Sequence, residues 1–189
     1  MPSNESLFIH WEKPISRRVV HTGRRIQVAV DTLTTLSGQT VARDVVLHPG
    51  AVAVLPVVDR ERIVLLRNYR FVVGETLWEV PAGTCEPPEP VEETARRELE
   101  EETGYHAECW TSCGFIYASP GVLDEKLHLF IAEGLRAGPA RPEPDEQLEP
   151  KVVYLSEAVA MCLDGRIKDA KTVALILRWE RQLRAGKSS

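Results

Sequence analysis

Residues 83–105 read GTCEPPEPVEETARRELEEETGY, and they are the most informative stretch of the chain. The part from residue 91 onward carries helical signals from end to end, since Pro90 suits the first helical position and Gly104 suits the position that ends a helix. Acidic residues at the start favour the positive end of the helix dipole. An apolar residue recurs every four positions and gives the helix a stripe that packs on the core. The stripe comprises Val91, Ala95 and Leu99.

Three glutamates of this segment share one side of the predicted helix. Glu98, Glu101 and Glu102 stand at i, i+3 and i+4, which places their carboxylates on neighbouring points of one face. We expect that face to be hydrated and to lie opposite the apolar stripe. Like charges at this spacing favour a bound cation, and hard oxygen ligands prefer Mg²⁺ or Mn²⁺ to zinc. The alternative is a solvated charged face that water, Arg96 and Arg97 screen.

The spacing across the whole stretch resembles the Nudix box, the signature of the Nudix hydrolase family. The matching residues are Gly83, Glu89, Arg97, Glu98, Leu99, Glu101, Glu102, Gly104 and Tyr105. Strands predicted on both sides of the helix fit the α/β/α sandwich of that family, so we expect the resemblance to extend from about residue 51 onward. It implies that Arg97 orients either Glu89 or Glu101. The residues with a structural part in the motif would be Gly83, Glu89 and Gly104.

The resemblance implies a metal-dependent hydrolase that cuts the pyrophosphate of a nucleoside diphosphate linked to another group. Glu98 and Glu102 would be the main ligands of Mg²⁺ or Mn²⁺, and Glu101 would lie close by as a further ligand. The Ala82 carbonyl is another candidate ligand, because Gly83 would let the backbone approach the metal. The chemistry agrees, since a divalent ion shields a pyrophosphate and lowers the pKa of an attacking water.

An acidic loop is expected to supply the catalytic base. In enzymes similar to this one, the base that activates water often comes from a loop outside the box. Residues 138–150 read GPARPEPDEQLEP, and their acidic residues are Glu143, Asp145, Glu146 and Glu149. Glu146 is our first choice, Glu149 the second, and Glu101 inside the box the next. A loop that serves only as a soluble linker is the alternative.

Residues outside the box are similar to patterns of the ADP-ribose pyrophosphatases within this family. The similar segments are Asn68-Tyr69-Arg70, 78–83 (WEVPAG), Ser119-Pro120-Gly121 and Asp124-Glu125-Lys126. The resemblance therefore implies hydrolysis of ADP-ribose to AMP and ribose 5-phosphate. The residues expected to bind this substrate are Arg70, Trp78, Glu79, Pro120 and Gly121. Ordinary alternatives are a solvated arginine, a core aromatic and a simple turn.

Two other functions stay open. GDP-mannose and other nucleotide-sugar pyrophosphatases share much of this pattern, as does the hydrolysis of flavin adenine dinucleotide (FAD). Nudix-like regulators bind related nucleotides without cutting them, but they usually carry a DNA-binding module or a broken box. Here the box is intact and residues 1–50 predict strands, so a catalytic function is favoured.

The remaining pattern predicts an α+β fold with two parts, a small antiparallel unit at 1–50 and the hydrolase domain at 51–189. The predicted strands cover 19–23, 26–36, 40–47, 51–58, 63–69, 75–83, 109–119, 127–135 and 150–155, and the predicted helices cover 91–105, 156–167 and 168–185. The first part is too short to bury a core alone, and the similar subfamily commonly forms dimers through N-terminal strands. We therefore expect a homodimer.

Composition limits the partners. The chain has 189 residues, a formal net charge of −5, 43% hydrophobic residues and four cysteines. The acidic balance argues against binding nucleic acid or anionic lipid, and no apolar run is long enough to span a membrane. The cysteines show no paired spacing, and the start of the chain lacks a signal-peptide pattern. We therefore expect a cytoplasmic protein with reduced thiols.

Overall fold

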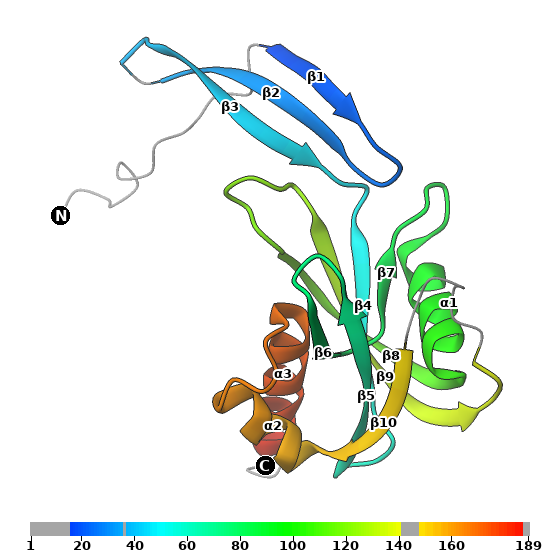
Figure 1. Ribbon diagram of the computed structural model, residues 1–189. Helices are drawn as coiled ribbons and strands as arrows, with labels where there is room; N and C mark the ends of the chain where they lie inside the picture. The colour runs from blue at the N-terminus through cyan, green and yellow to red at the C-terminus, as the bar shows by residue number, and fades with distance from the viewer. Residues whose placement is uncertain (1–15, 36, 141–147, 187–189) are drawn as a thin grey trace. The chain divides into compact units, whose positions relative to one another are not determined.

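The computed structural model describes residues 16–35, 37–140 and 148–186, which belong to two compact units (Figure 1). The first unit comprises the chain up to His48 together with 119–125. The second unit comprises 49–118 and the chain from Lys126 onward. Among the described residues, no helix combines the length and the apolar character that crossing a membrane requires.

The first unit contains a three-stranded antiparallel sheet, as the sequence predicted. Its strands are β1 (Ser16–Thr22), β2 (Gln27–Thr34) and β3 (Thr40–Leu47), in that order. Segment 119–125 joins this unit through backbone hydrogen bonds. Val46 N–H donates to the Val122 carbonyl at 2.7 Å, and Asp124 N–H donates to the Val46 carbonyl at 3.1 Å. The predicted division at residue 50 did not include this segment.

The described residues of the second unit form two sheets and three helices. The larger sheet has the order β7-β4-β9-β8, in which β4 and β9 run parallel and the other neighbours run antiparallel. The smaller sheet has the order β10-β5-β6 and is antiparallel. The elements are β4 (Ala51–Pro56), β5 (Arg62–Arg70), β6 (Glu75–Glu79), β7 (Ala82–Thr84), α1 (Val91–Thr103), β8 (Tyr105–Tyr117), β9 (Lys126–Ala137), β10 (Leu148–Tyr154), α2 (Leu155–Leu163) and α3 (Ala170–Gly186).

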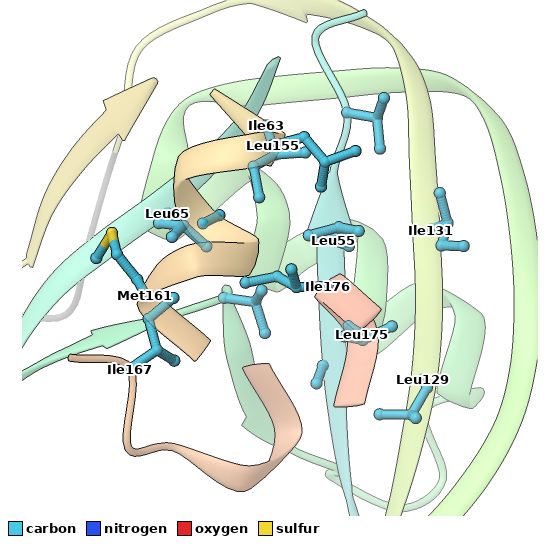
Figure 2. Packing of buried hydrophobic residues seen from close by; sticks show 14 of the residues in the cluster. Leu55, Ile63, Leu65, Leu129, Ile131, Leu155, Met161, Ile167, Leu175 and Ile176 are labelled. Carbon is cyan, nitrogen blue, oxygen red and sulfur yellow. The ribbon is translucent and has the colours of Figure 1, made fainter. Parts of the chain in front are cut away.

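Strand β4 is buried on both faces and forms the centre of this unit. Its side chains alternate between two core clusters, as the pleat of a strand requires. The first cluster joins Leu55 to Leu175 of α3 and Met161 of α2 (Figure 2). The second cluster joins Val54 to Leu99 of α1. The larger sheet therefore lies between helices, and the predicted α/β/α sandwich is confirmed.

The prediction of a single strand over 75–83 is wrong. The segment forms two strands in different sheets, β6 ending at Glu79 and β7 beginning at Ala82. Pro81 has no N–H to donate to a ladder, and its carbonyl accepts a hydrogen bond from Val54 N–H at 2.9 Å. The chain changes sheets at this proline, and the change places β7 against α1.

Candidate functional site

Helix α1 carries most of the predicted site, and its ends are marked by Pro90 and Gly104. Pro90 precedes the first helical residue, so its predicted position was wrong by one residue. Gly104 adopts the left-handed conformation with φ of 73°, and its N–H donates to the Glu100 carbonyl at 2.8 Å. The helix ends at Thr103, before the predicted bound at Tyr105. The prediction that Gly104 ends the helix is confirmed, and the positive φ explains why glycine stands there.

The carboxylates of Glu98 and Glu102 are buried on α1. The exposed fractions of these residues are 9% and 3%, so the expectation of a hydrated face is wrong. The reason is the neighbouring strand β7, whose Ala82 N–H donates to Glu102 Oε2 at 3.0 Å. A buried charge needs such partners, because removing it from water is costly. The helix therefore buries part of its acidic side as well as its apolar stripe.

Gly83 lies directly against the carboxylate of Glu98. A Cβ atom built on this glycine would stand 2.0 Å from Glu98 Cδ, which is far inside any real contact. Any larger residue would force either β7 or the carboxylate to move. Close approach to Glu98 is therefore the local reason for a glycine at this position.

Arg97 gathers several carboxylates around one guanidinium group. Its Nη1 donates to Glu98 Oε1 at 2.8 Å and to Glu101 Oε2 at 2.9 Å, and its Nη2 donates to Glu89 Oε2 at 3.3 Å. Burial alone would lower the pKa of Arg97, but these partners outweigh burial and raise the pKa above its usual value. The hydrogen bond from Arg97 is also the main cause that lowers the pKa of Glu89. Arg97 thus contacts both carboxylates that it was expected to orient.

The oxygen ligands on α1 have the chemistry that a hard cation requires. Within the ranges that the structure describes, no three His, Cys, Asp or Glu side chains lie close enough to hold a metal ion as they stand. Glu98 and Glu101 instead share the positive charge of Arg97. Carboxylates that converge on a guanidinium group also fit Mg²⁺ or Mn²⁺, provided that they exchange this partner for the ion.

Arg70, expected to bind substrate, forms a two-point ion pair with Glu79. Its Nε and Nη2 donate to the two carboxylate oxygens at 2.8 and 2.6 Å. Glu79 is only 2% exposed and also accepts a hydrogen bond from Lys171 at 3.1 Å. Burial raises the pKa of Glu79, but the two cations more than offset it, so the pKa lies below its usual value. The Arg70 side chain remains 43% exposed, so part of it is open to a ligand.

Three further residues of the predicted substrate site belong to other segments than α1. Trp78 is half-buried against the first core cluster, and the Arg67 guanidinium lies 5.0 Å from its ring centre. This placement matches an ordinary core aromatic. Pro120 and Gly121 are exposed and belong to the first unit, whereas α1 belongs to the second.

The acidic loop is described only at its ends. Glu149 lies in β10 rather than in a loop, which corrects the predicted start of that strand. Its carboxylate forms an exposed ion pair with Lys151 at 2.5 Å. The other acidic residues of the loop lie outside the described residues; they are Glu143, Asp145 and Glu146.

The sequence analysis predicted α3 but assigned no role to the residues of its first turn. Asp169 caps this helix, because its Oδ2 accepts hydrogen bonds from Thr172 N–H at 3.0 Å and from Thr172 Oγ1 at 2.5 Å. An aspartate just before an apolar periodic segment is a helix-start signal and could have identified Asp169. No local signal pairs Lys171 with Glu79, which is 92 positions away.

Comparisons with known proteins identify relatives of this chain. The model of the NUDIX domain matches residues 47–176. The chain is 39% identical over 167 residues to an ADP-ribose pyrophosphatase of Bacillus subtilis, covering 87% of this chain and 90% of the relative. It is 38% identical, with the same coverage, to a methanol dehydrogenase activator of Bacillus methanolicus. A GDP-mannose pyrophosphatase of Cronobacter sakazakii is 37% identical over 136 residues, covering 67% of this chain and 71% of the relative.

A solved structure shows the same fold. The crystal structure of an ADP compounds hydrolase matches with a TM-score of 0.80 at 22% sequence identity. The match covers 93% of this chain and 95% of that one. At this identity, the likeness concerns the fold alone.

Proposed function

Because this chain belongs to the Nudix hydrolase family, we propose that it hydrolyses ADP-ribose to AMP and ribose 5-phosphate. The observation that carries the proposal is the similarity to an ADP-ribose pyrophosphatase along 87% of the chain. The acidic residues and Arg97 on α1 support it, since a pyrophosphate reaction needs concentrated charge at one place.

We propose that the site uses Mg²⁺ or Mn²⁺, held by Glu98, Glu101 and Glu102 with the Ala82 carbonyl as a further ligand. A divalent ion, when bound, neutralises charge on the pyrophosphate and makes an attacking water more acidic. Other groups of the chain hold these carboxylates in position. Arg97 orients Glu98 and Glu101, and Ala82 N–H fixes one oxygen of Glu102. Without a cation, a chain of net charge −5 would repel this substrate.

A substrate panel tests the proposed reaction. We expect ADP-ribose to have the highest kcat/KM among ADP-ribose, GDP-mannose, NADH, FAD and diadenosine polyphosphates, with Mg²⁺ or Mn²⁺ present. Mass spectrometry of the products should show AMP and ribose 5-phosphate. A much higher kcat/KM with GDP-mannose or FAD would contradict the assignment of ADP-ribose as substrate. It would leave the assigned reaction, hydrolysis of a pyrophosphate, unchanged.

GDP-mannose or another nucleotide sugar is the second candidate substrate. The similarity to a GDP-mannose pyrophosphatase over 67% of this chain favours it. A third hypothesis is that the protein binds nucleotides without cutting them. Complete absence of metal-dependent turnover, with ADP-ribose binding retained, would favour that hypothesis.

We propose Glu146 as the general base, because the loop that contains it is acidic and precedes β10. Glu146→Gln is expected to lower kcat by about 10²- to 10⁴-fold, the typical contribution of a general base, with little change in Mg²⁺ affinity. Glu149→Gln is the matched comparison, because Glu149 is already paired with Lys151. Steady-state kinetics from pH 6 to 9 measure both variants. Unchanged kcat in both would move the role to Glu101.

We propose a homodimer formed through the first unit. Every residue of β1 is exposed, and only Ala29 and Asp31 are buried in the described part of the three-stranded sheet. Such a sheet buries too little surface to be stable alone. Light scattering at micromolar concentration should give the mass of two chains. A monomeric mass with full activity would refute the proposal.

We also propose a cytoplasmic location. Cys85, Cys109, Cys113 and Cys162 are all free thiols in the structure. Free thiols in this number are typical of reducing compartments. Burial is the main cause that raises the pKa of Cys85 and Cys162, which makes these two thiols less reactive.

A further inference from the structure

The first turn of α3 is bonded to the backbone that follows β6. The hydroxyl of Thr172, fully buried, accepts a hydrogen bond from Val80 N–H at 2.9 Å. The same hydroxyl donates to Asp169 Oδ2 at 2.5 Å. One oxygen atom thus joins the cap of α3 to Val80. A buried N–H without this acceptor would be left unpaired, which is destabilising.

A second connection runs in parallel through Lys171. Its ammonium group donates to Glu79 Oε2 at 3.1 Å and to Asp169 Oδ1 at 2.8 Å. The side chains of Lys171 and Glu79 are only 13% and 2% exposed, so solvent screens this ion pair little. Helix α3 and its cap therefore hold two consecutive residues, namely Glu79 at the end of β6 and Val80 just after it.

The backbone that α3 holds leads directly to the carboxylates of α1. Two residues after Val80, Ala82 N–H donates to Glu102 Oε2 at 3.0 Å. The next residue, Gly83, is the one whose added Cβ would stand 2.0 Å from Glu98 Cδ. A shift of Val80 is therefore passed within a few bonds to both buried glutamates. Displacements of about 1 Å at a catalytic group can cost about 10²-fold in rate.

We infer that Asp169, Lys171 and Thr172 are positioning residues for Glu98 and Glu102, acting through the backbone from Glu79 to Gly83. The inference rests on the proposed function, in which these two glutamates hold the metal ion. Helix α3 is then part of the active-site scaffold as well as a cover for the core.

A matched pair of substitutions at Thr172 tests this inference. Thr172→Val keeps the shape and removes the hydroxyl, whereas Thr172→Ser keeps the hydroxyl and removes a methyl group. We expect Thr172→Val to lower kcat and Mn²⁺ affinity by about 10- to 100-fold, as outer-shell changes do, and Thr172→Ser to recover most of both. The KM for ADP-ribose should stay within about twofold, because Thr172 is not proposed to touch substrate.

The control is Lys168→Met. Lys168 forms an ion pair with Glu75, which links the start of β6 to the segment before α3, but both side chains are exposed. This variant should keep wild-type kcat, Mn²⁺ affinity and melting temperature, since exposed ion pairs contribute little.

Two readouts do not depend on turnover. Mn²⁺ binding can be followed by electron paramagnetic resonance without substrate, and hydrogen exchange reports on single amides. The amides of Val80 and Ala82 should exchange faster in Thr172→Val than in Thr172→Ser. If the wild type hydrolyses nothing in the panel, the proposed function fails, while these readouts still decide the positioning role.

Wild-type Mn²⁺ affinity and unchanged exchange at Ala82 in folded Thr172→Val would overturn the inference. If Thr172→Val does not fold, Lys171→Met replaces it, with Lys171→Arg as the conservative partner. If Lys171→Met and Lys171→Arg both bind Mn²⁺ as tightly as the wild type, the inferred positioning role is also overturned. A loss in Lys171→Met that Lys171→Arg restores would support it.

Discussion

Replacing Glu98 or Glu102 with glutamine is expected to lower kcat by about 10⁴-fold, which corresponds to about 5 kcal/mol of lost transition-state stabilisation. Glutamine keeps the shape of the side chain and a carbonyl oxygen, which at position 102 can still accept a hydrogen bond from Ala82 N–H. It removes the negative charge that the proposed metal ion requires. The change therefore separates charge from packing at both positions.

Glu100→Gln is the matched control for this pair. Glu100 stands on the same helix, but its side chain is 44% exposed, and its ion-pair partner is His106 at 3.4 Å. It should keep wild-type kcat, and circular dichroism should show all three variants folded. Loss of the charge attraction between Arg97 and Glu98 offsets any relief of like-charge repulsion, so we expect little change in melting temperature for Glu98→Gln. Near-normal kcat in both site variants at limiting Mg²⁺ would contradict their role as ligands.

Gly83→Ala is expected to lower kcat by about 10³-fold and the free energy of unfolding by about 1–3 kcal/mol, because overpacking forces the surrounding atoms to move. The new methyl group would overlap the Glu98 carboxylate, whose Cδ lies 2.0 Å from the position of that carbon. Either β7 moves away from α1, or Glu98 turns out of its place. Both outcomes separate Glu98 from the other ligands.

Two comparisons isolate this clash. Gly186→Ala adds the same methyl group where no atom lies within 4 Å, so its kcat and stability should not fall. In Gly83→Ala, a second change of Glu98→Asp shortens the opposing side chain and should recover stability but not kcat. Denaturant unfolding and steady-state kinetics measure the two effects. A fully active Gly83→Ala would mean that Glu98 works from another position.

The parts of the fold that sequence predicts well are those with strong local signals. The apolar run at 51–58 indicated a strand buried on both faces, and β4 is such a strand. Gly104 marked the end of α1 because no other residue accepts a positive φ as easily. The sheet change at Pro81 was missed because the segment around it reads as one continuous strand. A proline inside a predicted strand is itself a warning against that assignment.

The part of the candidate site that lies within one segment was predictable from the sequence. The contacts between segments that are distant in the sequence were not. Helical spacing placed Glu98 and Glu102 on one side of α1, but their burial depends on β7, which the helix pattern does not describe. The partner of Arg70 is nine positions away on the neighbouring strand, and Lys171 approaches from α3. Such contacts arise from packing, and no spacing rule within one segment contains them.

The parallel pairing of β4 with β9 also bears on how the chain folds. Ala51 of β4 lies opposite Leu127 of β9, so β4 cannot form this pairing until a strand much later in the sequence has been synthesised. Parallel neighbours need such long connections, and pairings of this kind slow folding. During synthesis, β4 leaves the ribosome as an apolar strand with an open edge. The nascent chain is therefore exposed to aggregation until β9 emerges.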